Sequence, residues 1–185
     1  MASDQVTLTS ARLELGPWTP EDAAAALTIF GRDEVTHWLT PAMEPIRDNA
    51  EMSATMERWA REDAEADPPV GHWAVRRGAD GVVVGSITLR RLPPFQEDLE
   101  LAWQFSPAYW GNGYAAEAAR AAADWAFDAS AHELFAVMRP ANGRAEKVAR
   151  RLGMQWVGET EKYYDLRLQV YRLRPTDLAD TSHQL

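Results

Sequence analysis

The most informative stretch of this sequence runs Phe105-Ser106-Pro107-Ala108-Tyr109-Trp110-Gly111-Asn112-Gly113-Tyr114-Ala115. It joins a segment predicted as a strand, 99–105, to a run with helical periodicity, 113–129. A glycine-rich turn between a strand and a helix leaves backbone N–H groups unpaired at the positive end of the helix dipole. Because glycine has no side chain, a pyrophosphate can approach those groups closely. The stretch therefore predicts an anion cradle, with a purely structural turn as the alternative.

The same turn also satisfies the dinucleotide-binding pattern in a formal sense, as Gly111-x-Gly113-x-x-Ala116. That fingerprint normally follows the first strand of a parallel βαβ series. Here the preceding segments 72–77 and 82–89, joined by the turn 78–81, are typical of a β-hairpin. The context therefore disfavours a dinucleotide-binding domain.

Working outward, the periodicities predict an α/β domain whose sheet is antiparallel first and contains a βαβ unit later. Helices are expected over about 19–30, 33–39, 49–66, 113–129 and 142–152, and strands over about 8–15, 72–77, 82–89, 99–105, 134–138, 155–158 and 168–173. Met52, Met56, Trp59 and Ala60 are expected on the buried face of the helix 49–66. Residues 1–185 are expected to form a single domain, with a core over about 8–173 and a C-terminal tail over 174–185.

The composition excludes several classes of protein. The chain has 185 residues, of which 46% are hydrophobic, so it is neither disordered nor fibrous. No apolar run approaches the roughly 20 residues of a membrane span, and the first residues lack the order of a signal peptide, so a cytoplasmic location is expected. The absence of cysteine excludes disulfides, thiolate metal sites and a cysteine nucleophile, and no metal site is predicted.

The charge is unevenly divided along the chain. Residues 1–70 contain 14 acidic and 5 basic residues, a net charge of −9, whereas residues 71–185 contain 14 of each. An acidic lobe does not suit a nucleic-acid backbone as partner. It suits a cationic ligand, or it serves only as a solubilising surface. The segment 139–151 is locally basic, with five Arg or Lys residues against Glu146.

The stretch from Trp110 to Ala115 resembles the acetyl-CoA loop of the GNAT superfamily of N-acetyltransferases, Gln/Arg-x-x-Gly-x-Gly/Ala, in all but its first position. Further segments resemble the family in chain order: Asp33-Glu34-Val35, Gly85-Ser86-Ile87-Thr88-Leu89, Glu100-Leu101-Ala102-Trp103 with Ser106-Pro107, Ala115-Ala116-Glu117-Ala118, and Arg139-Pro140-Ala141-Asn142 followed by Arg151-Leu152-Gly153-Met154. Together they span about residues 8–173 and are most similar to the RimJ/RimL-type branch. The resemblance implies the GNAT acyl-CoA N-acyltransferase fold, an α/β fold with a mixed, mostly antiparallel sheet flanked by helices.

The resemblance also implies an activity, with acetyl-CoA as co-substrate. The acetyl group would pass directly to a primary amine, either a protein N-terminal α-amine or a small-molecule amine such as an antibiotic. The strand ending at Phe105 would be splayed to admit the pantetheine arm. The residues expected to bind CoA are Gln104, Phe105, Trp110, Gly111, Asn112, Gly113, Tyr114, Ala115, Asn142 and Lys147, with Arg144 as a further phosphate contact.

Acetyl transfer to an amine needs a base for the amine and a proton for the leaving thiolate. Glu100 is the first candidate base, acting directly or through a water, although it could instead lie on a solvated strand face. Tyr164 is the candidate acid, with Tyr163 beside it, and packing is the alternative role for both. His37 is a candidate lining residue of the acceptor cleft, whereas His72 is expected to be structural or at the surface.

Several positions depart from the family pattern. Trp110 replaces the usual Arg or Gln, and Ala145 stands where a serine is usual. Val137 and Ala149 occupy the places of an acid and a tyrosine that some relatives use. A catalytically weakened CoA- or acyl-CoA-binding regulatory module is therefore the alternative function. Two questions stay open: the identity of the acceptor, for which a cationic amine is one candidate, and the oligomeric state, monomer or homodimer.

Overall fold

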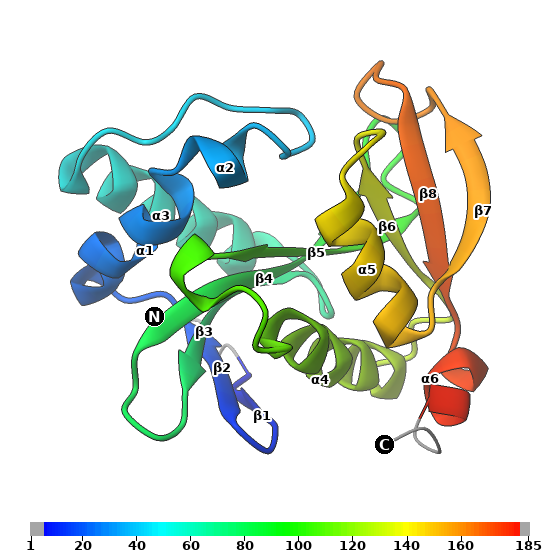
Figure 1. The fold of residues 1–185 in the computed structure, drawn as a ribbon, viewed down its shortest axis with the longest axis horizontal. Helices are drawn as coiled ribbons and strands as arrows, with labels where there is room; N and C mark the ends of the chain where they lie inside the picture. Colours follow the sequence, from blue (N-terminus) through cyan, green and yellow to red (C-terminus); the bar gives the residue numbers. More distant parts are fainter. Residues whose placement is uncertain (1–5, 182–185) are drawn as a thin grey trace.

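Across residues 6–181, which the computed structural model describes, eight strands form one mixed sheet (Figure 1). Their order in the sheet is β1-β2-β3-β4-β5-β6-β8-β7, and every neighbouring pair is antiparallel except β5 and β6. The strands are β1 (Leu8–Thr9), β2 (Leu13–Pro17), β3 (Gly71–Arg77), β4 (Val83–Arg91), β5 (Leu99–Phe105), β6 (Leu134–Met138), β7 (Gln155–Thr160) and β8 (Leu168–Leu173).

Helices cover both faces of this sheet. They are α1 (Ala23–Phe30), α2 (Asp33–Thr36), α3 (Asn49–Glu65), α4 (Tyr114–Asp128), α5 (Gly143–Leu152) and α6 (Pro175–Thr181), with single 3₁₀ turns at Pro20–Asp22 and Pro107–Tyr109. In Figure 1, α1, α2 and α3 lie above strands β3–β5 and α4 lies below them, which agrees with the contacts of α1 and α3 with β4 and β3. None of the helices in this part of the chain is long and apolar enough to cross a membrane.

The main core lies between α4 and the sheet. Ala118, Ala119, Ala122, Ala123 and Ala126 of α4 are fully buried there. Alanine side chains let a helix axis approach a sheet closely, and the apolar side chains of β2–β5 fill the space that remains. Ala115, at the start of the same helix, is half-buried and lines the cleft described below.

Three predictions of local structure are wrong. The segment 8–15 forms two short antiparallel strands, because the backbone turns at Ser10, whose N–H donates to the carbonyl of Leu13. In α3, Thr55 is buried in place of Ala60, because positions 52, 55, 56 and 59 share a helix face. Most of the expected tail forms α6, which begins at a proline and buries Leu178 in the main core.

Candidate active site

The cleft of the molecule opens where two parallel strands separate. Strands β5 and β6 pair at Glu100 and Phe135 alone within the described chain, so their C-terminal halves diverge. A cleft of about 580 Å³ lies there, and its walls include Ala102–Phe105 on one strand and Ala136–Met138 on the other. The divergence agrees with the predicted splay of the strand ending at Phe105.

The glycine loop lies at one end of this cleft. Gly111 and Gly113 have φ angles of +84° and +78°, in the left-handed region that favours glycine. Gly113 immediately precedes the 15-residue helix α4, so the unpaired N–H groups of the first helical turn face the same end of the cleft. A Cβ atom at Gly113 would lie 3.2 Å from the Arg151 guanidinium, in the space that a bound group would need. This geometry fits a pyrophosphate.

The Trp110 side chain helps to fix this loop. Its Nε1–H donates to the carbonyl oxygen of Phe105 over 2.9 Å, which ties the loop to the end of β5. The Arg144 guanidinium lies 3.4 Å from the centre of the Trp110 ring, a cation–π contact that joins the loop to α5. Trp110 therefore contributes more than a backbone amide, and its side chain links the two walls of the cleft.

Most of the residues predicted to bind CoA line the cleft. They are Gln104, Phe105, Trp110, Gly111, Gly113, Tyr114, Ala115, Asn142 and Lys147. Asn112 does not, because its side-chain amide turns back and donates to the carbonyl of Tyr109 over 2.9 Å. Asn142 caps α5, where its Oδ1 accepts from the backbone N–H of Ala145. Arg144, Lys147 and Arg151 give this end of the cleft a positive charge suited to phosphates.

Polar side chains of the sheet form the floor of the other end. Arg90 and Glu100 are direct cross-strand partners, and Arg90 Nε donates to Glu100 Oε2 over 2.5 Å. Glu100 is only 2% exposed, so the alternative of a carboxylate on a solvated strand face is wrong. Burial raises the pKa of Glu100 above its ordinary value, and the Arg90 guanidinium opposes that rise.

His72 lies in the wall of the same end, a position that the sequence did not predict. Its Nδ1 is 2.7 Å from Asp63 Oδ1, and its Nε2 is 4.0 Å from Glu62 Oε2. The Trp59 ring stacks on the imidazole, with centroids 5.3 Å apart and an interplanar angle of 9°. A carboxylate on Nδ1 fixes the orientation of an imidazole, so His72 is a second possible proton acceptor. His37 is exposed and does not line the cleft, whereas its neighbour Trp38 does.

The two tyrosines of the β7–β8 loop lie behind this end of the cleft. Tyr163 is buried, and its hydroxyl donates to Asp98 over 2.6 Å. Tyr164 is half-buried, with its ring 5.6 Å from the Arg90 guanidinium, and it is not among the cleft-lining residues. Burial raises the pKa of both hydroxyls, which makes each a weaker acid. Tyr164 as the acid therefore stays a prediction without a direct contact.

The segment between α2 and α3 closes the cleft from above. Leu39 and Thr40 line it, and their backbone is held by Arg90 of β4 and by Arg139, which follows β6. Arg90 donates to the carbonyl of Thr40 over 3.1 Å, and Arg139 donates to the carbonyl of Leu39 over 3.2 Å. Arg90 thus connects Glu100 to this segment.

Sequence reasoning missed Arg90, Arg151 and the position of His72. Strand alternation could have placed Thr88 and Arg90 on one face, but only the β4–β5 register sets Arg90 opposite Glu100. No local signal marks Arg151, because its proximity to Gly113 depends on how α4 and α5 pack. Within residues 6–181, no group of three or more His, Asp or Glu side chains could hold a metal ion.

Three comparisons with known proteins, by family model, by curated sequence and by solved structure, each found similar proteins. A family model for the acetyltransferase (GNAT) domain matches residues 12–155. The uncharacterized protein YkkB of Bacillus subtilis is 34% identical over 77 residues, 41% of this chain and 44% of YkkB, so the match spans less than half of that relative. The uncharacterized N-acetyltransferase YoaA of the same species is 25% identical over 154 residues, 82% of this chain and 84% of YoaA.

The third comparison concerns a solved structure. A protein described as a candidate ribosomal-protein-serine acetyltransferase from Vibrio cholerae superposes with a TM-score of 0.74 at 17% identity, covering 92% of this chain and 98% of that chain. At this low sequence identity, the similarity shows the fold alone. The predicted α/β fold, with a mixed and mostly antiparallel sheet flanked by helices, is confirmed.

Proposed function

Because the chain belongs to the GNAT acetyltransferase family, we propose that it transfers an acetyl group from acetyl-CoA directly to a primary amine. The observation that carries the proposal is the arrangement of the cleft. A glycine cradle with three basic side chains lies at one end, and two candidate proton acceptors, Glu100 and His72, lie at the other. The diverging strands β5 and β6 connect these ends.

The cradle residues fit the pyrophosphate of CoA. The N–H groups at the start of α4 donate hydrogen bonds to phosphate oxygens, and the glycines keep side chains out of the way. Arg144, Lys147 and Arg151 balance the phosphate charge from the side of α5. Bound acetyl-CoA supplies the thioester whose carbonyl carbon the amine attacks, forming a C–N bond as the C–S bond breaks.

The acceptor end of the cleft must also accept the proton that the amine loses. The attacking amine must be neutral, and deprotonation at pH 7 costs about 4.6 kcal/mol for a lysine-like amine but about 1.1 kcal/mol for an α-amine. Glu100 is suited to take the proton, because burial raises its pKa toward the pH range in which a general base works best. Arg90 holds the carboxylate in place. His72, oriented by Asp63, is the second candidate.

The acceptor is proposed to be an amine of low pKa, either a protein N-terminal α-amine or a small-molecule amine such as an antibiotic. The resemblance of the sequence to the RimJ/RimL-type branch favours the first class. The cleft also has apolar walls from Phe30, Trp38 and Trp59, which suit an acceptor with an apolar group beside its amine. A cytoplasmic location and a monomer or homodimer stay predictions from the sequence.

Two measurements test this function. Calorimetry should show that CoA and acetyl-CoA bind, and a thiol-release assay with a panel of amines should show turnover of acetyl-CoA. Failure of the folded protein to bind CoA would contradict the proposal. Binding without release by any amine would instead favour the regulatory module, a result consistent with the missing hydroxyl at Ala145.

A further inference from the structure

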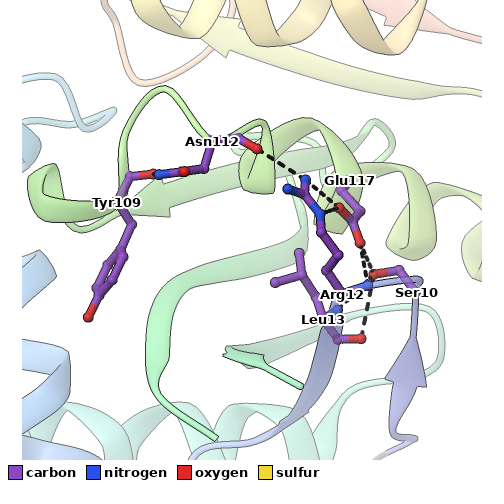
Figure 2. Close-up of polar contacts among 6 residues, drawn as sticks. All are labelled: Ser10, Arg12, Leu13, Tyr109, Asn112 and Glu117. Carbon is purple, nitrogen blue, oxygen red and sulfur yellow. Dashed lines mark hydrogen bonds and ion pairs between the residues drawn. The ribbon is translucent and has the colours of Figure 1, made fainter. Parts of the chain in front are cut away.

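The N-terminal β1–β2 hairpin contacts the helix that follows the glycine loop. Glu117 lies in the first turn of α4, and its carboxylate accepts three hydrogen bonds from that hairpin (Figure 2). Ser10 Oγ donates to Oε1 over 2.7 Å, and the backbone N–H of Arg12 donates to the same oxygen over 2.8 Å. Arg12 Nε donates to Oε2 over 2.7 Å. Residues more than 100 positions apart in the chain are thus joined.

The Arg12 guanidinium also reaches the glycine loop. Its NH2 group donates to the carbonyl oxygen of Asn112 over 3.1 Å (Figure 2), and its Cζ lies 4.7 Å from the centre of the Tyr114 ring. In a trans peptide the C=O and the following N–H point in opposite directions. Because the Asn112 carbonyl points to Arg12, the N–H of Gly113 points away from Arg12. Gly113 lines the cleft, whereas Arg12 does not.

The same contacts also neutralise a negative charge close to the proposed phosphate site. A carboxylate close to the start of α4 stabilises the helix but repels an anion bound there. Partial burial tends to raise the pKa of Glu117, yet the hydrogen bonds from Ser10 and Arg12 lower it below the ordinary value. Glu117 is therefore charged at neutral pH, and Arg12 balances that charge at 2.7 Å.

We propose that Arg12 and Glu117 form a clamp that holds the Asn112–Gly113 peptide with its N–H toward the cleft, and so positions the loop for the pyrophosphate of CoA. This inference rests on the proposed function. Neither residue lines the cleft, so both act through the loop as positioning residues. The clamp explains why the loop binds through the backbone and why the hairpin that precedes α1 is needed for the site.

The test compares CoA with pantetheine, which has the thiol arm but no pyrophosphate. Calorimetry should show that Arg12→Gln and Glu117→Gln each weaken CoA binding about 10- to 150-fold, the range expected for loss of a hydrogen bond to a charged group. Pantetheine affinity should change less than about twofold. Because the two residues act as a unit, the double variant should bind CoA about as weakly as either single variant. Arg12→Lys should restore only part of the affinity, because an ammonium does not reproduce the planar fork.

Arg167→Gln is the matched control. Arg167 pairs with Glu159 over 2.7 Å between β7 and β8, and neither residue lines the cleft. This variant should bind CoA like the parent protein. Equal losses of affinity for CoA and pantetheine would overturn the clamp. Normal CoA binding by Glu117→Gln would also overturn it, because Arg12 would then act only through direct attraction for phosphate. Absence of CoA binding by the parent protein would instead contradict the proposed function.

Discussion

Replacing Gly113 by tryptophan tests the cradle directly. Gly113 has a φ of +78°, precedes the first turn of α4 and lines the cleft. An L-residue in this left-handed conformation costs about 1–2 kcal/mol, and an indole there would fill the space next to the helical N–H groups. The Arg151 guanidinium, 3.2 Å from the position of the new Cβ, can move because it ends a flexible side chain.

The two effects have different magnitudes and different readouts. The backbone strain should lower the melting temperature by about 2–8 °C, at about 2–4 °C per kcal/mol for a chain of this size. Loss of two hydrogen bonds to a charged phosphate, at about 1.5–3 kcal/mol each, corresponds to CoA binding that is about 10²- to 10⁴-fold weaker. The affinity should therefore fall far more than the fold stability.

Gly81→Trp is the matched control for the strain. Gly81 has a φ of +72° in the turn between β3 and β4, lies outside the cleft and has no neighbouring atom within 4 Å of the place that a Cβ would occupy. Its variant should lose similar thermal stability and keep CoA affinity in calorimetry. If folded Gly113→Trp binds CoA as the parent protein does, the cradle is not the pyrophosphate site. If both variants lose affinity equally, the loss comes from stability alone.

Three further predictions concern other parts of the site. Glu100→Gln should lower kcat about 10²- to 10⁴-fold with CoA affinity unchanged. Burial of Glu100 shifts the acid limb of the pH–rate profile above the ordinary carboxylate range, and this limb should disappear in the variant. A near-full rate would show that another group accepts the proton. Trp110→Ala should weaken CoA binding more than Trp110→Phe in calorimetry, because phenylalanine keeps the ring under Arg144 and loses only the hydrogen bond to Phe105. If both variants bind CoA as the parent protein does, only the backbone of Trp110 matters. The pKa of Glu117 is lowered in the folded protein, so its charge stabilises the folded state above the unfolded pKa, and this stabilisation is lost as the pH falls through the folded pKa. The melting temperatures of Glu117→Gln and the parent protein should therefore converge between about pH 7 and pH 3. A constant difference between them would contradict this linkage.

The elements of the fold could be predicted because each carries its own local signal. The strand 99–105 is found at the predicted bounds, and the glycine turn and the helix after it lie within one residue of the prediction. The hairpin turn 78–81 and the cap at Asn142 have the sequence chemistry that such positions require. The segment 8–15 was one exception, because its alternation fits one strand as well as two short ones, and the helix α6 in the expected tail was another.

The site was predictable where it depends on backbone and unpredictable where it depends on register and packing. The residues of the glycine loop are nearly contiguous in the sequence, so the loop at the end of the cleft could be predicted. Glu100 could be named from its motif, but its burial and its partner Arg90 follow from the pairing of β4 with β5. The dyad of His72 and Asp63 joins a strand to a helix, and the Arg12–Glu117 contact spans 105 residues. No local pattern encodes such distances.

A charge count along the sequence does not show where the acidic side chains lie relative to the cleft. The net charge of −9 in residues 1–70 left two alternatives open, a cationic ligand or a solubilising surface. Among residues 6–70, only Glu34 and Arg58 bring charged side chains to the cleft wall, and their charges cancel. Glu57 lies outside the wall, and Asp63 is hydrogen-bonded to His72. Arg90 also pairs with Glu100 at the cleft floor, so the cleft wall itself does not carry the acidic excess of residues 6–70.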